Sequence, residues 1–121
     1  MPIFVIHEHS ATKLHWDLRL EFQNVLKSWA VPKIPPTRAG IKRLAIQVED
    51  HPLSYANFEG EIKEGYGKGT VKIWDSGEYY LEEEDDKKIV FILKGNKLRG
   101  KYVLLKTSFS KNSWIFFKMK S

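Results

Sequence analysis

The segment from residue 14 to residue 22 alternates strictly between apolar and polar side chains, and this alternation constrains the fold more than any other feature. Its apolar positions are Leu14, Trp16, Leu18, Leu20 and Phe22. Its polar positions are His15, Asp17, Arg19 and Glu21. Because successive side chains of a strand point to opposite faces of a sheet, the segment predicts a strand with one apolar face and one charged face.

The charged face has two interpretations. The simpler one is a solvated strand face, which is the usual fate of alternating strands in antiparallel sheets. The other is a binding site, because His, Asp and Arg at successive positions suit a metal ion and an anion better than they suit bulk water. His9 and His51 supply matching ligand types elsewhere in the chain. The choice of residues therefore favours a site.

Composition limits the classes of protein that remain. At 121 residues, the chain has the length of one domain, residues 1–121, that buries roughly two thirds of the surface of its unfolded form. Cysteine is absent, so any metal must be held by imidazole and oxygen ligands, which favours Mn²⁺, Mg²⁺ or Zn²⁺. The net charge of +5 is compatible with a polyanionic partner.

Hydropathy bears on location. No apolar run approaches the ~20 residues that a membrane-spanning helix needs, and the N-terminus lacks the pattern of a secretory signal. We therefore expect a soluble, cytoplasmic protein with no membrane partner. Nothing in the sequence suggests an obligate oligomer, so we expect a monomer.

Turn signals separate short strand patterns along most of the chain, which is typical of an all-β barrel or sandwich. Residues 32–40 predict a loop, since their three prolines cannot donate ladder hydrogen bonds. Residues 53–67 predict a loop with a short helical turn at 55–58, and residues 75–77 predict a hairpin turn. The predicted strands are 3–8, 14–22, 25–31, 43–49, 70–74, 78–81, 89–93, 101–106 and 114–118.

A hairpin of the first two strands can bring metal-ligand types together. His9 ends the first strand pattern, a four-residue link follows, and Asp17 lies in the next strand. In the fourth strand the polar parity of residues 43–49 continues to His51, just past the predicted strand end. Two imidazoles, one carboxylate and open coordination positions suit a catalytic metal.

Further polar side chains suit phosphoryl chemistry. Three cations can clamp a phosphate and stabilise transition-state charge: Arg19, Lys33 and Arg43. His15 shares a face with Asp17, so it either serves as a proton donor or phosphate ligand or merely hydrogen-bonds a neighbour. Glu21 and Glu49 either orient such groups or are exposed strand carboxylates.

Two other motifs carry weaker signals. Residues 82–88 hold consecutive carboxylates, a pattern more typical of a solvated loop than of a metal cluster. The glycine-rich residues 64–69, which include Tyr66, lack the spacing of a phosphate-binding loop, and no helix is expected after them. They predict a tight connection between strands.

Several motifs in a fixed order resemble one known family. They are His9-x5-His15-Trp16-Asp17-Leu18-Arg19-Leu20-Glu21, Leu26-Lys27-Ser28-Trp29-Ala30-Val31-Pro32-Lys33, Lys42-Arg43-Leu44-Ala45, Val48-Glu49-Asp50-His51-Pro52-Leu53-x-Tyr55 and Trp74-Asp75-x-Gly77. From about Phe4 to the C-terminal strands, the chain resembles the phosphoesterase module of bacterial DNA ligase D. The resemblance implies an all-β fold (or a β-rich one with short helices), a compact single-domain β-barrel with a polar interior active site.

The resemblance also implies an activity, that of a DNA-end-healing phosphoesterase dependent on Mn²⁺, with other divalent ions such as Co²⁺ or Zn²⁺ as substitutes. Family members remove a 3′-terminal ribonucleoside and then the remaining 3′-phosphate, which leaves a 3′-hydroxyl for repair by end joining. The implied partners are DNA 3′ ends at primer-template junctions or breaks. No ligase Lys-x-Asp-Gly motif is present, so we expect any ligase and polymerase to be separate chains.

By position, the resemblance assigns three metal ligands: His9, Asp17 and His51. It assigns phosphate-binding and catalytic roles to His15, Arg19, Lys33 and Arg43. Glu49 and Tyr55 also match functional positions, the tyrosine chiefly for removal of the monoester phosphate. His7 stands where a glutamine is usual, so that a further imidazole lies near the metal or else faces outward.

Two other functions remain open on the sequence. A non-catalytic nucleic-acid-binding barrel would use aromatic rings as stacking platforms, and the candidates are Trp29, Trp74, Tyr79, Tyr80 and Trp114. Aromatic residues within apolar alternation are, however, more typical of a core. A general metal-dependent phosphatase of small molecules would use the same cationic clamp.

Overall fold

The computed structural model describes residues 1–65 and 67–120, so the part of the glycine-rich motif at Tyr66 lies outside the described residues. Within these ranges the chain forms nine strands and one short 3-10 helix. The strands are β1 (Ile3–Ser10), β2 (Leu14–Phe22), β3 (Val25–Val31), β4 (Lys42–Pro52), β5 (Gly60–Ile62), β6 (Gly69–Glu84), β7 (Lys88–Lys94), β8 (Arg99–Lys106) and β9 (Ser113–Lys118). The helix η1 (Leu53–Asn57) confirms the predicted helical turn.

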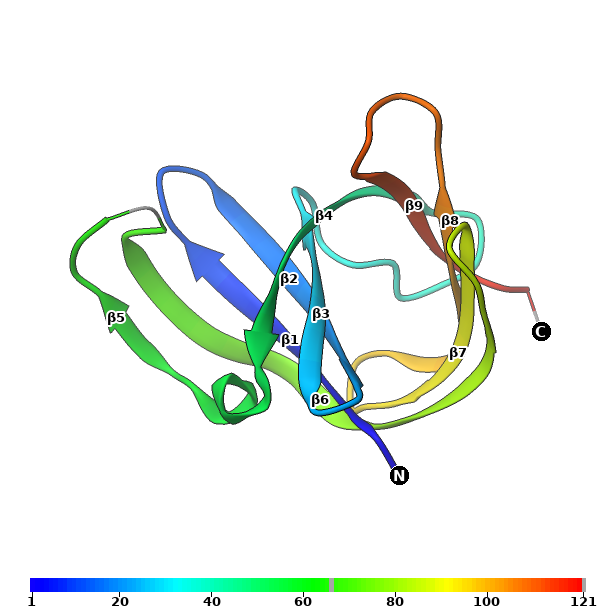
Figure 1. Cartoon of the computed structure of the whole chain (residues 1–121), viewed down its shortest axis with the longest axis horizontal. Coiled ribbons are helices and arrows are strands. Elements are labelled where there is room, and N and C mark those ends of the chain that lie inside the picture. Colours follow the sequence, from blue (N-terminus) through cyan, green and yellow to red (C-terminus); the bar gives the residue numbers. More distant parts are fainter. Residues whose placement is uncertain (66, 121) are drawn as a thin grey trace.

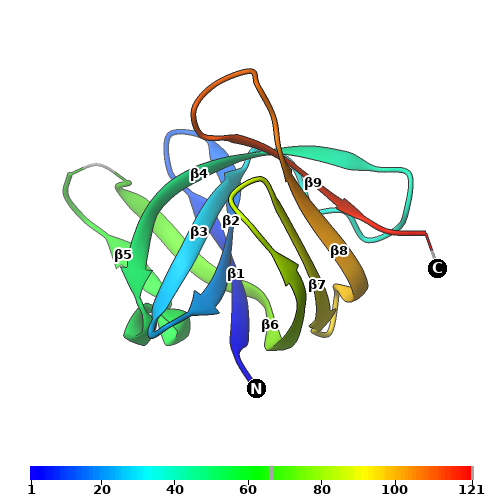
Figure 2. The ribbon, with the colours of Figure 1, turned by 45° about the vertical axis from the view of Figure 1, so that its right-hand side comes forward.

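Eight of the strands close into an antiparallel barrel. The order is β1-β2-β3-β4-β9-β8-β7-β6, and pairing of β1 with β6 closes the ring, while β5 adds to the other side of β6. Figures 1 and 2 show β5 and the first half of β6 on one side of the molecule and β7, β8 and β9 on the other. The barrel confirms the predicted fold class. The predicted interior position of the polar site is wrong, because apolar side chains fill the barrel and the polar residues of β1 and β2 lie on the opposite face.

The main apolar cluster fills the interior of the barrel. It takes Trp16, Leu18 and Leu20 from β2, together with buried side chains of β1, β3, β7, β8 and β9. The predicted apolar parity of β2 therefore faces the core, and its polar parity lies on the opposite face of the same wall. A second, smaller cluster around Val5, Leu26 and Ala56 covers part of that opposite face, where η1 packs.

The predicted hairpin turn at residues 75–77 is wrong, because these residues lie inside the 16-residue strand β6. The carboxylate of Asp75 does not close a turn of its own. Instead it accepts hydrogen bonds from the backbone amides of Asn96, Lys97 and Leu98 in the β7–β8 connection. At Gly77, an added Cβ would lie 2.3 Å from the Lys94 carbonyl oxygen, so here glycine allows two strands to approach closely.

The predicted face pattern of β4 is also wrong. Ala45 belongs to the apolar core, and Gln47 accepts a hydrogen bond from the indole of Trp114, so the parity that includes Arg43 faces the barrel side. A register shift in the β3–β4 pairing then places two residues of β4 opposite one of β3. This bulge inverts the parity. It brings His51, which lies within β4 rather than beyond it, to the outer face.

Gly69 at the start of β6 has φ of +149°, and a Cβ added there would lie 1.9 Å from the Ser10 carbonyl oxygen. We expect Gly69→Ala to lower the free energy of unfolding by about 2–5 kcal/mol, because the cost of backbone strain and the cost of a steric clash add together. Gly40→Ala is the matched control, since Gly40 also has positive φ but nothing lies within 4 Å of the added Cβ. Urea denaturation measures both; equal losses would contradict the close packing at Gly69.

In the part of the chain that the structure describes, no helix has the length and apolar character needed to cross a membrane.

Candidate metal centre

The polar residues of β1 and β2 meet on the outer face of the barrel wall. Pairing of the two strands places His7 opposite Asp17 and His9 opposite His15. His51 reaches the same region from the bulged end of β4, and Tyr55 reaches it from η1. The site is thus assembled from the β1–β2 hairpin, the end of β4 and the helix η1 that follows it; Figure 1 shows the course of the hairpin and of β4.

Asp17 is the centre of this group. Its carboxylate oxygen Oδ2 lies 3.3 Å from His15 Nε2, 3.6 Å from His9 Nδ1 and 3.3 Å from Arg19 Nη2, and the residue is only 5% exposed. Burial opposes its ionisation, but the hydrogen bond from His15 and the charge of Arg19 hold the pKa of Asp17 below its ordinary value. The same hydrogen bond raises the pKa of His15. The carboxylate is therefore anionic and accepts hydrogen bonds from His15 and Arg19.

The donor set fits a divalent metal ion. His9, His15 and Asp17 each offer one ligand atom, and these atoms lie within 4.8 Å of one another. Two of the three predicted ligands are thus together, with His15 as their neighbour. The third predicted ligand, His51, lies beyond Arg19, with its Nδ1 3.2 Å from Arg19 Nη1. Imidazole and carboxylate ligands are those that Mn²⁺ and Zn²⁺ accept.

Backbone carbonyls orient every histidine of the group. The pairs are His7 Nε2 with Phe58 O at 3.1 Å, His9 Nε2 with Gly67 O at 2.7 Å, His15 Nδ1 with Lys13 O at 3.3 Å and His51 Nδ1 with Glu49 O at 3.1 Å. A ring nitrogen that donates to a carbonyl leaves the lone pair of a neutral imidazole on the other nitrogen. For His9 that nitrogen is Nδ1, which faces Asp17.

Arg19 connects the two halves of the site. Its Nε donates to His7 Nδ1 at 3.0 Å, Nη1 donates to Ser28 Oγ at 2.9 Å and lies 3.2 Å from His51 Nδ1, and Nη2 donates to Asp17 at 3.3 Å. A guanidinium has five N–H bonds, so these contacts leave one free if His51 Nδ1 accepts from Arg19 and two free if His51 Nδ1 donates to Glu49. The bidentate phosphate fork predicted from the sequence therefore requires that Arg19 does not donate to His51.

The Nδ1 atom of His51 has two possible hydrogen-bond partners. Its Nδ1 can donate to the Glu49 carbonyl or accept from Arg19, and in the first case the neutral ring carries its lone pair on Nε2. Burial, and next the charge of Arg19, lower the pKa of His51. The ring is thus kept neutral, as a metal ligand must be.

His7 is the participant that sequence reasoning left undecided. Its side chain is fully buried, and its ring meets the edge of Tyr55 at 5.2 Å between centroids. Burial, and then the charge of Arg19, lower the pKa of His7 to about 4, so the ring is neutral near pH 7. The available signal was parity, since His7 and His9 are two residues apart in one strand and share a face.

Three predicted residues are not joined to the group by the described contacts. Lys33 is exposed in the loop between β3 and β4. Arg43 pairs with Phe116 of β9, and its Nε donates to the Ile34 carbonyl at 2.7 Å, so it anchors the loop that carries Lys33. Glu49 contributes its carbonyl to His51, while the residue itself is exposed.

Tyr55, by contrast, joins the group directly. Its ring lies 4.9 Å from that of His51 between centroids, and Arg19 Cζ lies 5.0 Å from the ring centroid. Burial raises the pKa of its hydroxyl, so the phenol stays protonated near pH 7. The structure thus brings together six of the nine residues that the sequence proposed: His9, His15, Asp17, Arg19, His51 and Tyr55.

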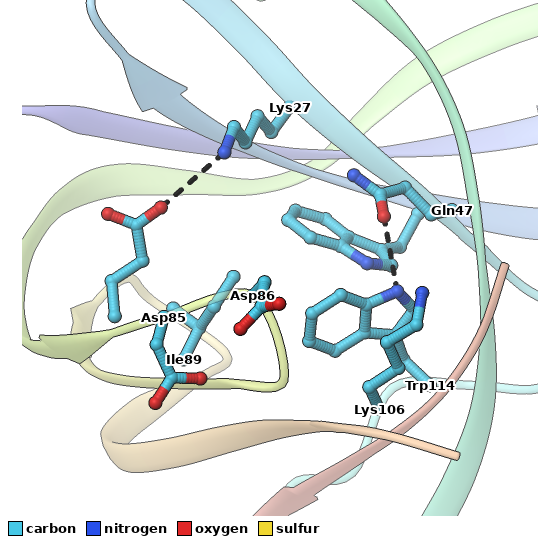
Figure 3. A pocket seen from close by; sticks show the side chains of 9 residues that line it. Lys27, Gln47, Asp85, Asp86, Ile89, Lys106 and Trp114 are labelled. Atoms are coloured by element: carbon cyan, nitrogen blue, oxygen red, sulfur yellow. Dashed lines mark hydrogen bonds and ion pairs between the residues drawn. The ribbon is translucent and has the colours of Figure 1, made fainter. Parts of the chain in front are cut away.

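A pocket of about 440 Å³ lies elsewhere, lined by the acidic turn of residues 84–86 and by Trp29 and Trp114 (Figure 3). Its charges are partly paired, since Lys27 Nζ lies 3.5 Å from a carboxylate oxygen of Glu84. The two tryptophans are 0% and 4% exposed, so their faces are not open for stacking on a base. They belong to the core, as the alternation favoured, and the acidic residues are exposed as predicted.

The family model described as the DNA ligase D 3′-phosphoesterase domain matches residues 7–106, a range that includes the whole metal-ligand group. The chain belongs to this family. The range that matches the phosphoesterase domain includes most of β1 and all of β2, the strand that carries Asp17.

Individual relatives of this phosphoesterase domain support the same assignment. The multifunctional non-homologous end joining DNA repair protein LigD of Mycobacterium tuberculosis (strain H37Rv) is 45% identical over 123 residues, which cover 98% of this chain and 16% of that protein. LigD of Pseudomonas aeruginosa (strain PAO1) is 42% identical over 125 residues, 97% of this chain and 15% of that protein. LigD of Mycolicibacterium smegmatis is 45% identical over 129 residues, 97% of this chain and 17% of that protein. This chain thus spans about one sixth of the length of each of these relatives.

Proposed function

We propose that this protein is a metal-dependent phosphoesterase that heals DNA 3′ ends, by removing a terminal ribonucleoside and then the remaining 3′-phosphate. The observation that carries the proposal is the buried Asp17 carboxylate with two imidazole nitrogens beside it, in a chain of the phosphoesterase family. We propose a role in end joining because the relatives are named as non-homologous end joining proteins. The net charge of +5 favours approach of a nucleic acid.

The metal would be held by His9, Asp17 and His51, with His15 close to the first two. Mn²⁺ is the ion we propose, with Co²⁺ or Zn²⁺ as substitutes, because the donor set consists of imidazole and carboxylate. When bound, such an ion polarises a phosphoryl oxygen and lowers the pKa of coordinated water. The carbonyls of Gly67 and Glu49 fix the ring orientations of His9 and His51, which is the usual support for ligating histidines.

The remaining side chains act on the substrate. His15 donates a proton to the leaving oxygen; its Nε2 lies 3.3 Å from Asp17 Oδ2, and this hydrogen bond raises the pKa of His15. Arg19 offers its free N–H to a phosphate oxygen. Phosphate binding by Lys33 and Arg43 is proposed on the resemblance alone, since the described contacts do not join them to the group. The hydroxyl of Tyr55 contacts the terminal phosphate during monoester removal.

The substrate in this proposal is a DNA 3′ end at a primer-template junction or a break, and the 3′-hydroxyl product is what a polymerase or ligase can extend or join. We propose that the protein acts as a monomer in the bacterial cytoplasm. Glu49 is exposed, and its carbonyl oxygen lies 3.1 Å from His51 Nδ1.

The test is a time course on a primer-template whose primer ends in one 3′ ribonucleotide, with Mn²⁺ or with a chelator. We expect metal-dependent shortening to a 3′-phosphate, followed by release of that phosphate. A small phosphate ester serves as the competitor. Equal hydrolysis of the small ester would overturn the DNA assignment, and turnover in chelator would overturn the metal dependence.

A further inference from the structure

His7 occupies a place that the proposed chemistry does not use. Its ring is fully buried between two fixed partners: Nε2 lies 3.1 Å from the carbonyl oxygen of Phe58, and Nδ1 accepts the Nε–H of Arg19 at 3.0 Å. A carbonyl can only accept and a guanidinium can only donate. The two contacts therefore require opposite roles at the two ring nitrogens, which a neutral imidazole supplies.

We infer that His7 is a positioning residue, which holds the guanidinium of Arg19 in the orientation that lets it contact Asp17 and His51. The kinetic effect expected of His7 rests on the proposed function, because it is measured as turnover of DNA 3′ ends. His7 itself is not among the three residues whose ligand atoms gather around Asp17. It therefore acts through Arg19 rather than on the metal or the substrate.

The geometry of Arg19 shows why such a support matters. The guanidinium lies over the ring of Tyr55, with Cζ 5.0 Å from its centroid, and His7 meets the same ring at 5.2 Å. The Nε contact to His7 restricts rotation of the planar group, so that Nη1 and Nη2 point to His51 and Asp17. Without an acceptor at Nε, this buried donor is unsatisfied, and the guanidinium gains freedom to turn away.

The first test compares His7→Gln with His7→Leu on the DNA 3′-phosphate substrate. A glutamine amide offers one acceptor and donors, whereas leucine offers neither. We expect His7→Leu to lower kcat about 10- to 100-fold with little change in KM, as is typical when a residue that orients an active-site group is lost. His7→Gln should retain activity within a few-fold. Equal losses in both variants would overturn the inference.

A matched control distinguishes positioning from packing. Val5 is buried on the same face of β1, two residues before His7, and belongs to the small apolar cluster. Val5→Ala should lower the melting temperature without changing kcat. If His7→Leu fails to fold, His7→Phe keeps a ring of similar shape and removes the acceptor. A normal kcat in a folded His7→Leu or His7→Phe would overturn the inference.

A double-mutant cycle tests whether the effect passes through Arg19. In an Arg19→Lys background, His7→Leu should cause little further loss of kcat, because the interaction is already absent. Multiplicative losses would show that His7 acts independently of Arg19.

A readout without substrate separates this inference from the proposed function. We expect the Arg19 Nε–H to exchange slowly with solvent by NMR in the wild-type protein and in His7→Gln, and rapidly in His7→Leu. If the wild-type protein does not hydrolyse DNA ends yet shows this pattern, the proposed function fails and the positioning contact stands. Equal exchange rates in all three proteins would overturn the contact.

Discussion

Asp17→Asn is expected to lower the kcat for DNA 3′-phosphate by about 10³-fold or more, since it removes an anionic ligand from a centre that supplies several kcal/mol of transition-state stabilisation. The carboxylate also accepts from His15 and Arg19, so the substitution removes the charged acceptor that raises the pKa of His15. Metal binding and proton donation are therefore lost together. The measurement is steady-state release of phosphate at saturating Mn²⁺.

Asparagine is preferred to alanine at this position for a physical reason. Both Asp17→Ala and Asp17→Asn remove the counter-charge of the buried Arg19 guanidinium, but Asp17→Ala also removes its hydrogen-bond acceptor. Breaking a buried pair outright in this way costs about 3–5 kcal/mol of stability. Loss of activity would then be mixed with loss of fold. Asp17→Asn keeps the shape and an oxygen acceptor for Arg19.

The matched control for Asp17 is Glu21→Gln. Glu21 shares the strand and the parity of Asp17, but its carboxylate accepts from the backbone amide of Ile3 at 2.9 Å and takes no part in the metal-ligand group. We expect near-normal kcat for this variant. The DNA affinity of Asp17→Asn should be unchanged or higher. A retained kcat in Asp17→Asn would exclude this carboxylate from the reaction.

Arg19→Lys is expected to have the second largest effect, a fall in kcat of about 10²-fold or more, although the positive charge is kept. The guanidinium is 3% exposed and reaches His7, Ser28, His51 and Asp17 at once. An ammonium group has no planar fork and cannot satisfy four partners in these directions. We also expect a loss of about 1–3 kcal/mol in the free energy of unfolding, because buried partners lose hydrogen bonds.

Arg38→Lys is the matched control for this change, since Arg38 is exposed in the loop between β3 and β4. Its kcat and urea midpoint should match those of the wild-type protein. The account of Arg19 as the connecting residue fails if Arg19→Lys behaves like Arg38→Lys in both measurements.

Much of the fold was predictable because alternation reports burial directly. The bounds of β2 and β3 agree with the sequence pattern, since each has one face on the apolar core. The continuous strand through residues 75–77 was not predictable from local chemistry. Asp75 and Gly77 are typical turn residues, but here their use is tertiary: a carboxylate that satisfies distant amides and a glycine that admits a neighbouring strand.

The site was predictable to the extent that it lies on one hairpin. His9, His15, Asp17 and Arg19 share the outer face through simple alternation of two paired strands. His51 was selected from its parity with residues 43–49 and again from the resemblance, but its predicted face relation to Arg43 is wrong because a bulge in β4 changes the parity between them. Bulges arise from strand pairing, which a single sequence does not reveal.

The most direct test of the central claim is a titration of the protein with Mn²⁺, followed by the electron paramagnetic resonance signal of the free ion, in parallel with phosphate release from a DNA 3′-phosphate. We predict one saturable site whose occupancy tracks the appearance of turnover, and loss of both in Asp17→Asn. Undiminished Mn²⁺ binding in Asp17→Asn, or turnover in wild-type protein before any ion binds, would contradict the assignment of Asp17 and its neighbouring histidines as the metal centre.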